Sequence, residues 1–154
     1  MVSGRFEHAA EKRKGQGRQT CPEQQRPVQA GRIREGEGRE ELYACFGVMG
    51  GFMQPQGHLQ VAVALIDDGL DPQAALDRPR FCIEDGRAGG AVSIEEGIPD
   101  EVLARLGEMG HSVTLRSGYA RSIFGRGQVI VRDPQSGVLW GGSDPRADGL
   151  AMSL

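Results

Sequence analysis

The sequence is poor in aromatic residues and in cysteine. Phe, Trp and Tyr make up 5% of its 154 residues, and 24 glycines indicate many turns around a modest core. The three cysteines form no CxxC pair and have no histidine at metal-ligand spacing, so neither a disulfide framework nor a zinc site is predicted. We interpret Cys21, Cys45 and Cys82 as reduced thiols, and we expect Cys45 and Cys82 to be buried and inert.

Long apolar runs are also missing. The first residues contain no apolar stretch of roughly seven or more, as a secretory signal would. No window approaches the roughly 20 apolar residues of a membrane span. At 154 residues the chain is long enough for one ordinary domain and too short for two well-buried ones. We therefore expect a cytoplasmic protein that does not bind a membrane.

Several catalytic patterns are absent as well. The sequence has no HExxH pattern and no carboxylate pair of the kind that glycosidases use. Gly125-Arg126-Gly127 looks like a phosphate loop, but the GxxxxGK[ST] spacing is missing. We predict no metal, no cofactor and no nucleotide.

Charge divides the chain into two parts. Residues 1–40 carry nine Lys and Arg against six Glu, which leaves nine basic against fifteen acidic residues in 41–154. The first part has only scattered apolar residues without a period of 2 or 3.6, so it is predicted to be a disordered leader. A basic arm that binds nucleic acid is the alternative, but interleaved glutamates and the lack of stacking aromatics disfavour it.

Apolar periodicity begins at Leu42 with a short strand, followed by a Gly-Gly turn. A helix comes next, because Leu59, Ala62, Val63 and Ile66 fall at i, i+3, i+4 and i+7; we expect these four side chains to share one face. Two shorter helices are predicted: QAALDR, capped by Asp71-Pro72, and a helix opened by Pro99 that has Val102, Leu103, Leu106 and Met109 on one face. Strands are predicted at 81–83, 91–94 and 111–115, and a hairpin is predicted from 128–131 and 138–140. The pattern predicts an α+β fold with helices packed on a mixed or antiparallel sheet.

Four stretches of the second part resemble the γ-glutamyltranspeptidase family, in matching order and spacing. They are FGVMGGFMQPQGHLQV at 46–61, DPQAALDRPRF at 71–81, SIFGRGQVI at 122–130 and LWGGSDPRADG at 139–149. The first and last are specific signatures. Residues 41–154 therefore resemble the C-terminal part of that family's small subunit, while residues 1–40 show no resemblance.

The resemblance implies a fold and a chemistry. The family belongs to the N-terminal-nucleophile hydrolases, whose fold is an αββα sandwich. Its precursor cuts itself to expose a threonine, whose hydroxyl attacks the γ-glutamyl amide of glutathione while its own α-amino group acts as base. Backbone N–H groups of a Gly-Gly pair then stabilise the oxyanion. In this sequence the pair matches Gly50 and Gly51; a plain strand-to-helix turn is the alternative interpretation.

The family's nucleophile is missing from this chain. Thr20 and Thr114 are the two threonines of the sequence, and neither begins the Thr-Thr-His stretch that opens the family's small subunit. The γ-glutamyl-binding groups upstream have no counterpart either. We therefore predict a chain that is inactive alone and that needs the missing N-terminal half and large subunit as partners before it acts on glutathione or another γ-glutamyl compound. An inactive truncated or frame-shifted remnant, at most an interaction module, is the alternative.

Other polar residues near these motifs are predicted to be structural. His58 is placed where a general base is conceivable, but its position in QGHLQ favours hydrogen bonding at the turn. His111 follows a helix end and is predicted to have no chemical role. Asp144 and Arg146 in SDPR are expected to form a charge-assisted pair that clamps the terminal loop.

Overall fold

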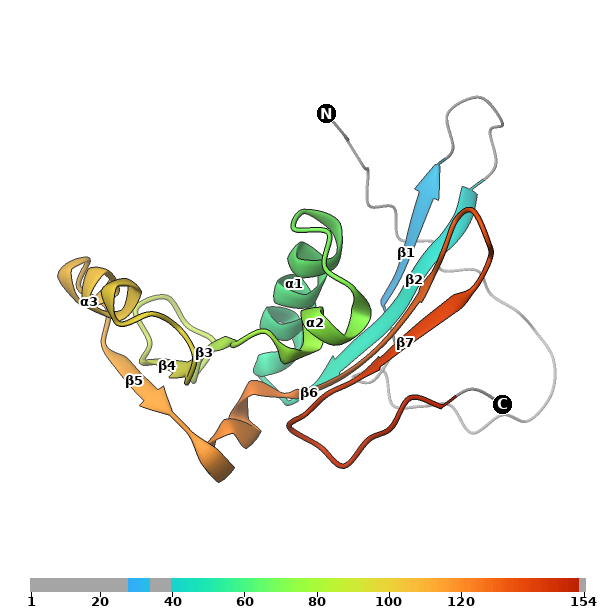
Figure 1. The fold of residues 1–154 in the computed structure, drawn as a ribbon. Helices are drawn as coiled ribbons and strands as arrows, with labels where there is room; N and C mark the ends of the chain where they lie inside the picture. Colours follow the sequence, from blue (N-terminus) through green and yellow to red (C-terminus); the bar gives the residue numbers. More distant parts are fainter. Residues whose placement is uncertain (1–27, 34–39, 153–154) are drawn as a thin grey trace, which may run out of the picture.

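A computed structural model describes residues 28–33 and 40–152 of the chain (Figure 1). The helices and strands lie in the order β1 (Val28–Ile33), β2 (Glu40–Met49), α1 (Met53–Ile66), α2 (Pro72–Asp77), β3 (Phe81–Ile83), β4 (Val92–Glu95), α3 (Asp100–Glu108), β5 (Val113–Arg116), the 3-10 helix η2 (Gly118–Phe124), β6 (Arg126–Arg132) and β7 (Leu139–Ser143). The predicted α+β class and the order of its elements from Leu42 onward are confirmed. None of the described helices is long and apolar enough to cross a membrane.

Two separate sheets form the framework. The larger has the order β1-β2-β6-β7 and is antiparallel throughout; the smaller has the order β3-β4-β5, with β4 and β5 parallel. Both predicted hairpins, β3 with β4 and β6 with β7, are confirmed. The division into two sheets was not predicted, because short strand patterns carry no information about which strands pair.

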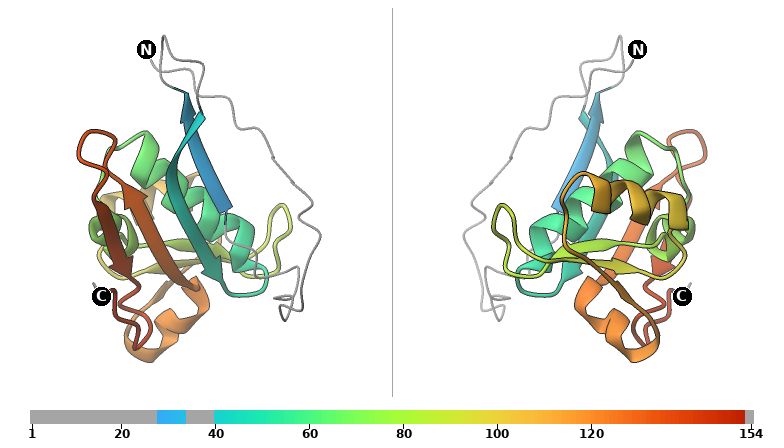
Figure 2. Two further views of the ribbon diagram at one scale, coloured as in Figure 1. Left: turned by 90° about the vertical axis from the view of Figure 1, so that its right-hand side faces the viewer. Right: turned by 90° about the vertical axis from the view of Figure 1, so that its left-hand side faces the viewer.

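Helices α1 and α2 cover one face of the larger sheet, and no described helix or strand covers its other face (Figures 1 and 2). The main core lies between these helices and the sheet. Its buried members are Ala44, Phe46, Val48, Val61, Ala64, Leu65, Ala75, Leu76 and Val129. Helix α2 begins as predicted, because the Asp71 carboxylate accepts hydrogen bonds from the backbone N–H groups of Gln73 and Ala74, both at 2.9 Å.

The face of α1 that carries Leu59, Ala62, Val63 and Ile66 is not the face that packs on the sheet. Leu59 and Ile66 are 62% and 42% exposed, whereas Gly57 and Val61 are among the residues that face the sheet. Gly57 explains the difference, because a Cβ at this position would lie 2.6 Å from Cγ1 of Val48. At Gly57 the backbone of α1 lies close to β2, and glycine is not one of the apolar residues from which a helical period is recognised.

The α3 helix has its predicted start after Pro99 and is followed by Gly110 at φ +90°, but its apolar face is not buried. Val102 and Met109 on this face are 42% and 63% exposed. The periodicity predicts an amphipathic helix correctly, but no residue of α3 is fully buried, and Leu103 and Leu106 are only half-buried.

Strand β1 lies inside the segment that we predicted to be disordered. Residues 28–33 pair with β2 at the edge of the larger sheet, with a register shift between Ala30 and Gly31. These six residues form a strand whose backbone is paired with β2. Residues 1–27 and 34–39 lie outside the described part of the chain, so the division into 1–40 and 41–154 stays a prediction.

Candidate functional site

Gly50 and Gly51 form a tight turn between β2 and α1. Their φ angles are +147° and +58°, values that residues with a side chain rarely adopt. The turn is closed by hydrogen bonds from the N–H of Met53 to the carbonyl of Gly50 at 3.0 Å and from the N–H of Gln54 to the carbonyl of Gly51 at 3.1 Å. The sequence therefore needs glycine at both positions.

The two glycines differ in their surroundings. A Cβ on Gly50 would lie 3.0 Å from the Cα of Gly125 and 3.2 Å from the Cβ of Met53. A Cβ on Gly51 would have nothing within 4 Å. Gly50 is thus wedged against the start of β6, while Gly51 lies next to open space in which a ligand could approach the backbone.

The backbone N–H groups of Gly50 and Gly51 donate no hydrogen bond within the described part of the chain. They lie at the N-terminal end of α1, a 14-residue helix whose peptide dipoles favour negative charge at this end. Adjacent free N–H donors in a fixed turn are what binding of an oxyanion requires. The arrangement can hold a negatively charged oxygen, although no described residue nearby is identified as a nucleophile.

His58 lies one turn into α1, where its ring bridges the helix to β2. Its Nε2 accepts a hydrogen bond from the N–H of Val48 at 3.2 Å, and its Nδ1 lies 2.5 Å from the carbonyl oxygen of Gln54. Both ring nitrogens are engaged with the backbone, in agreement with the predicted hydrogen-bonding role. The ring contacts the strand before the Gly50–Gly51 turn and the first turn of α1.

The remaining sequence candidates are Thr20, Thr114, His111, Cys45 and Cys82. Thr114 and His111 are exposed near β5, and Thr20 lies outside the described residues. Cys82 is buried, and burial, reinforced by the charge of Glu84, raises the pKa of its thiol above the ordinary value of 9.0. Cys45 is half-buried, less than expected. No group of His, Cys, Asp and Glu side chains that could hold a metal ion occurs among the described residues.

Asp144 and Arg146 form an ion pair, with Nη1 of Arg146 3.0 Å from Oδ1 of Asp144. Arg146 also donates to the backbone carbonyl groups of Leu76 at 2.8 Å and Arg78 at 3.0 Å. The guanidinium therefore ties the segment after β7 to the end of α2, which is the geometry that a clamp of the terminal loop requires. We predict that the pair clamps this loop.

This pair belongs to a larger buried network that the sequence did not reveal. Nη1 of Arg80 lies 2.9 Å from Oδ2 of Asp144, and these two side chains are 2% and 0% exposed. Glu95 on β4 pairs with Arg146 and with Arg121, the latter at 2.6 Å. It also accepts a hydrogen bond from the backbone N–H of Arg80 at 2.9 Å. The network joins the smaller sheet to the larger one.

Glu95 makes stability depend on pH. Burial alone would raise the pKa of its carboxyl group, but hydrogen bonds from Arg146, Arg121 and the Arg80 backbone outweigh burial and hold the pKa below its ordinary value of 4.5. The unfolded chain then takes up the proton at a higher pH than the folded chain. The stabilisation is present at neutral pH and is lost as the pH falls from about 4.5 through the lower pKa of the folded state.

We therefore expect the free energy of unfolding, measured with urea at a series of pH values, to fall below about pH 4.5. The variant Glu95→Gln should show a weaker dependence over this range. Because hydrogen bonds also lower the pKa values of Glu84 and Asp133, the wild-type slope contains several groups. Parallel curves for the variant and the wild type would show that Glu95 does not contribute.

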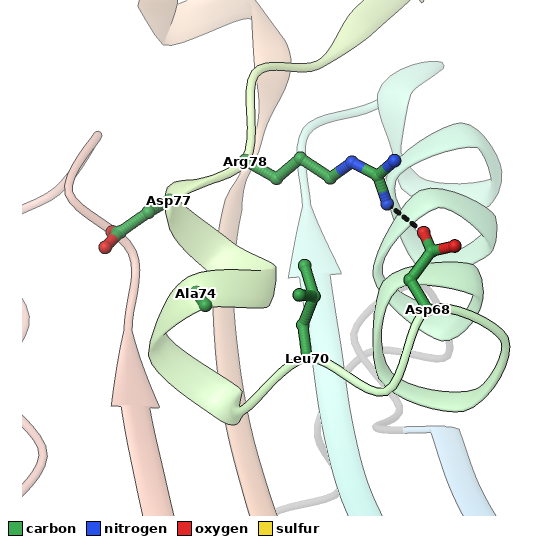
Figure 3. A pocket seen from close by; sticks show the side chains of 5 residues that line it. All are labelled: Asp68, Leu70, Ala74, Asp77 and Arg78. Atoms are coloured by element: carbon green, nitrogen blue, oxygen red, sulfur yellow. Dashed lines mark hydrogen bonds and ion pairs between the residues drawn. The ribbon is translucent and has the colours of Figure 1, made fainter.

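An open pocket of about 530 Å³ lies between the end of α1 and α2. Figure 3 shows its lining by Asp68, Leu70, Ala74, Asp77 and Arg78, with Arg78 paired to Asp68. Both partners of that pair are about half exposed. None of the residues that line the pocket is a predicted site residue, and neither Gly50 nor Gly51 is among them.

The family model described as Gamma-glutamyltranspeptidase matches residues 34–154. The match begins at residue 34, seven residues before residue 41, where the composition of the sequence changes.

Curated relatives carry different names. The glutathione hydrolase-like YwrD proenzyme of Bacillus subtilis is 32% identical over 113 residues, which are 71% of this chain and 21% of that protein. The oxamate amidohydrolase proenzyme of Klebsiella pneumoniae is 32% identical over 117 residues, which are 75% of this chain and 21% of that protein. The chain thus spans about a fifth of the length of the curated relatives that it matches.

A solved structure of a cephalosporin acylase from Bacillus halodurans is 47% identical, with a TM-score of 0.64. The match covers 71% of this chain and 20% of that one. Solved γ-glutamyltranspeptidases that are 23% identical or less share the fold of this chain. The expected fold, part of an N-terminal-nucleophile hydrolase sandwich, is confirmed.

Proposed function

Because this chain belongs to the gamma-glutamyltranspeptidase family, we propose that its Gly50–Gly51 turn supplies the oxyanion-binding N–H groups of an amide hydrolase or transferase. The observation that carries the proposal is the pair of adjacent glycines at positive φ, whose N–H groups donate no hydrogen bond among the described residues. The substrate class is a γ-glutamyl compound such as glutathione. The nucleophilic threonine comes from a region outside this chain.

In this proposal the chain stabilises the negative charge that develops in both steps of the reaction. When the threonine hydroxyl of the complete enzyme attacks the amide carbonyl, negative charge develops on the carbonyl oxygen. The N–H groups of Gly50 and Gly51 donate hydrogen bonds to this oxygen, and the N-terminal end of α1 adds a favourable dipole. The same donors act again when water or an acceptor amine attacks the γ-glutamyl ester.

A second substrate class has its own support. The Bacillus halodurans cephalosporin acylase is 47% identical to this chain, more than the glutathione hydrolase-like relative at 32%. The oxyanion turn contacts the carbonyl oxygen, which all amides share, so it does not distinguish these substrates. Hydrolysis of a different amide by the same mechanism is therefore the second candidate function.

The uncovered face of the larger sheet is proposed to pack against the region that completes the enzyme. Strand alternation turns Cys45, Met49, Ile130 and Leu139 away from α1 and α2. Met49, Ile130 and Leu139 are 49%, 50% and 66% exposed. Apolar side chains on a sheet face need a second layer, and an αββα sandwich provides one in its second sheet.

We expect the isolated chain to self-associate through this face. Size-exclusion chromatography with light scattering should show species larger than a monomer. The variant Ile130→Lys should reduce association, because it places a charge in the middle of the face. Leu59→Lys, at an exposed site on α1, is the control and should leave it unchanged. A monodisperse wild-type monomer that unfolds sharply and cooperatively would contradict the expectation.

The proposal is tested with a chimera. Residues 41–154 of this chain replace the corresponding part of the Bacillus halodurans relative, so that the rest of that protein supplies the remaining machinery. Release of p-nitroaniline from γ-glutamyl-p-nitroanilide and hydrolysis of a cephalosporin amide are then measured. Activity supports a functional oxyanion turn, and the better substrate separates the two candidates. A folded but inactive chimera would favour the alternative, an inactive remnant that acts at most as an interaction module.

A further inference from the structure

We infer that the buried ion pair between Arg80 and Asp144 positions the Gly50–Gly51 turn, because it fixes the backbone on both sides of Gly125, the residue against which Gly50 is packed. The inference rests on the proposed function for its catalytic meaning. The structural part, that the pair orders the turn, stands independently of any activity.

The Arg80 and Asp144 side chains form hydrogen bonds with the backbone on both sides of Gly125. Nη1 of Arg80 donates a hydrogen bond to the carbonyl of Phe124 at 3.1 Å. Oδ2 of Asp144 accepts a hydrogen bond from the N–H of Gly127 at 2.6 Å. The same Nη1 and Oδ2 atoms lie 2.9 Å apart, so the ion pair bridges the residues that precede and follow Gly125-Arg126.

Gly125 packs directly against the Gly50–Gly51 turn. Its own φ is +75°, and a Cβ there would lie 2.6 Å from the carbonyl oxygen of Met49 and 2.8 Å from Cγ1 of Val48. A Cβ on Gly50 would lie 3.0 Å from the Cα of Gly125. The two backbones are in contact without side chains between them. A shift of Gly125 would therefore be passed to Gly50 directly.

A purely stabilising role explains the pair poorly. A buried ion pair costs desolvation that its attraction barely offsets, and apolar replacements of similar size are often as stable. Here desolvation lowers the pKa of Arg80 despite the neighbouring Asp144 carboxylate, and Arg80 Nε has no hydrogen-bond partner among the described residues. What apolar side chains cannot supply is the directed pair of hydrogen bonds to the Phe124 carbonyl and the Gly127 N–H.

The experiment is hydrogen exchange with mass spectrometry on the purified chain. The amides of Met53 and Gln54, which close the turn, report its order. In the double variant Arg80→Met/Asp144→Leu, which keeps the interior apolar, we expect these amides to exchange about tenfold faster, the effect of losing a charge-assisted hydrogen bond. Peptides from the second half of α1 should be unchanged.

A control separates positioning from general loosening. Val61→Ala removes a buried contact of α1 in the main core and should speed exchange along the helix without selective effect on the turn. Turn amides that exchange at the wild-type rate in the double variant, or no faster than in Val61→Ala, would overturn the inference. If the double variant does not fold, Arg80→Lys is measured in its place, since Lys keeps the charge but lacks the second nitrogen of the guanidinium fork.

In the chimera the same double variant should lower kcat while leaving KM nearly unchanged, because the oxyanion exists only in the transition state. Faster exchange of the turn with unchanged kcat would retain the positioning role and contradict the proposed oxyanion function. Unchanged exchange with a lower kcat would contradict the positioning role. The two proposals therefore fail in distinguishable ways.

Discussion

Replacing Gly50 with alanine in the active chimera is expected to lower kcat by about 10²- to 10³-fold, the loss that removal of one oxyanion donor produces in other enzymes. Alanine is strained at φ +147°, and its Cβ would lie 3.0 Å from the Cα of Gly125. The turn must therefore shift, and the N–H donors move out of line with the developing oxyanion. KM should change little, since the interaction is made in the transition state.

Gly69→Ala is the matched control for this substitution. Gly69 also has a positive φ, +66°, but a Cβ there would have nothing within 4 Å, and the residue follows the far end of α1. It should cost about 1 kcal/mol of stability and leave kcat unchanged. Equal losses of kcat in the two variants would attribute the effect to general destabilisation and would remove the support for an oxyanion turn.

Truncating Asp144 to alanine is expected to destabilise the chain by about 3 to 5 kcal/mol, as measured by urea unfolding. The loss leaves the Arg80 guanidinium buried without its counter-ion and removes a partner of Arg146. It also removes the acceptor for the N–H of Gly127. If this pairing clamps the terminal loop, proteolysis in the segment after Ser143 should become faster in the variant.

An exposed ion pair provides the comparison. Arg105 and Glu108 on α3 lie 2.9 Å apart, and their side chains are 74% and 66% exposed. Glu108→Ala should change the free energy of unfolding by less than about 0.5 kcal/mol, because solvent screens the pair. An Asp144→Ala variant as mild as Glu108→Ala would show that the buried network does not hold the two sheets together.

Local patterns predicted the elements of this fold better than their packing. The cap formed by Asp71, the glycine after α3 and the turn between β6 and β7 are all local features, and the structure has each of them. Apolar residues surround most of α1, so their periodicity did not indicate which face of the helix is buried. Its orientation is set by Gly57 against Val48, a contact between residues on different elements.

The charged network had a weaker signal in the sequence. Arg80 lies in DRPRF and Asp144 in SDPR, both within stretches that resemble the family, but the residues are far apart in the chain. A buried arginine requires a partner, and only the folded chain shows that the partner is Asp144 and that Glu95 joins them. The Gly50–Gly51 pair was found from its surrounding motif, since two adjacent glycines alone are common in turns.

The most direct test of the account is release of p-nitroaniline from γ-glutamyl-p-nitroanilide by the purified chain alone and by the chain co-expressed with the nucleophile-bearing segment of a relative. The account predicts no release by the chain alone and release by the co-expressed pair, which Gly50→Ala abolishes or strongly reduces. Release by the chain alone would mean that it contains a nucleophile of its own. That result would contradict the conclusion that this chain supplies the oxyanion turn to a threonine located elsewhere.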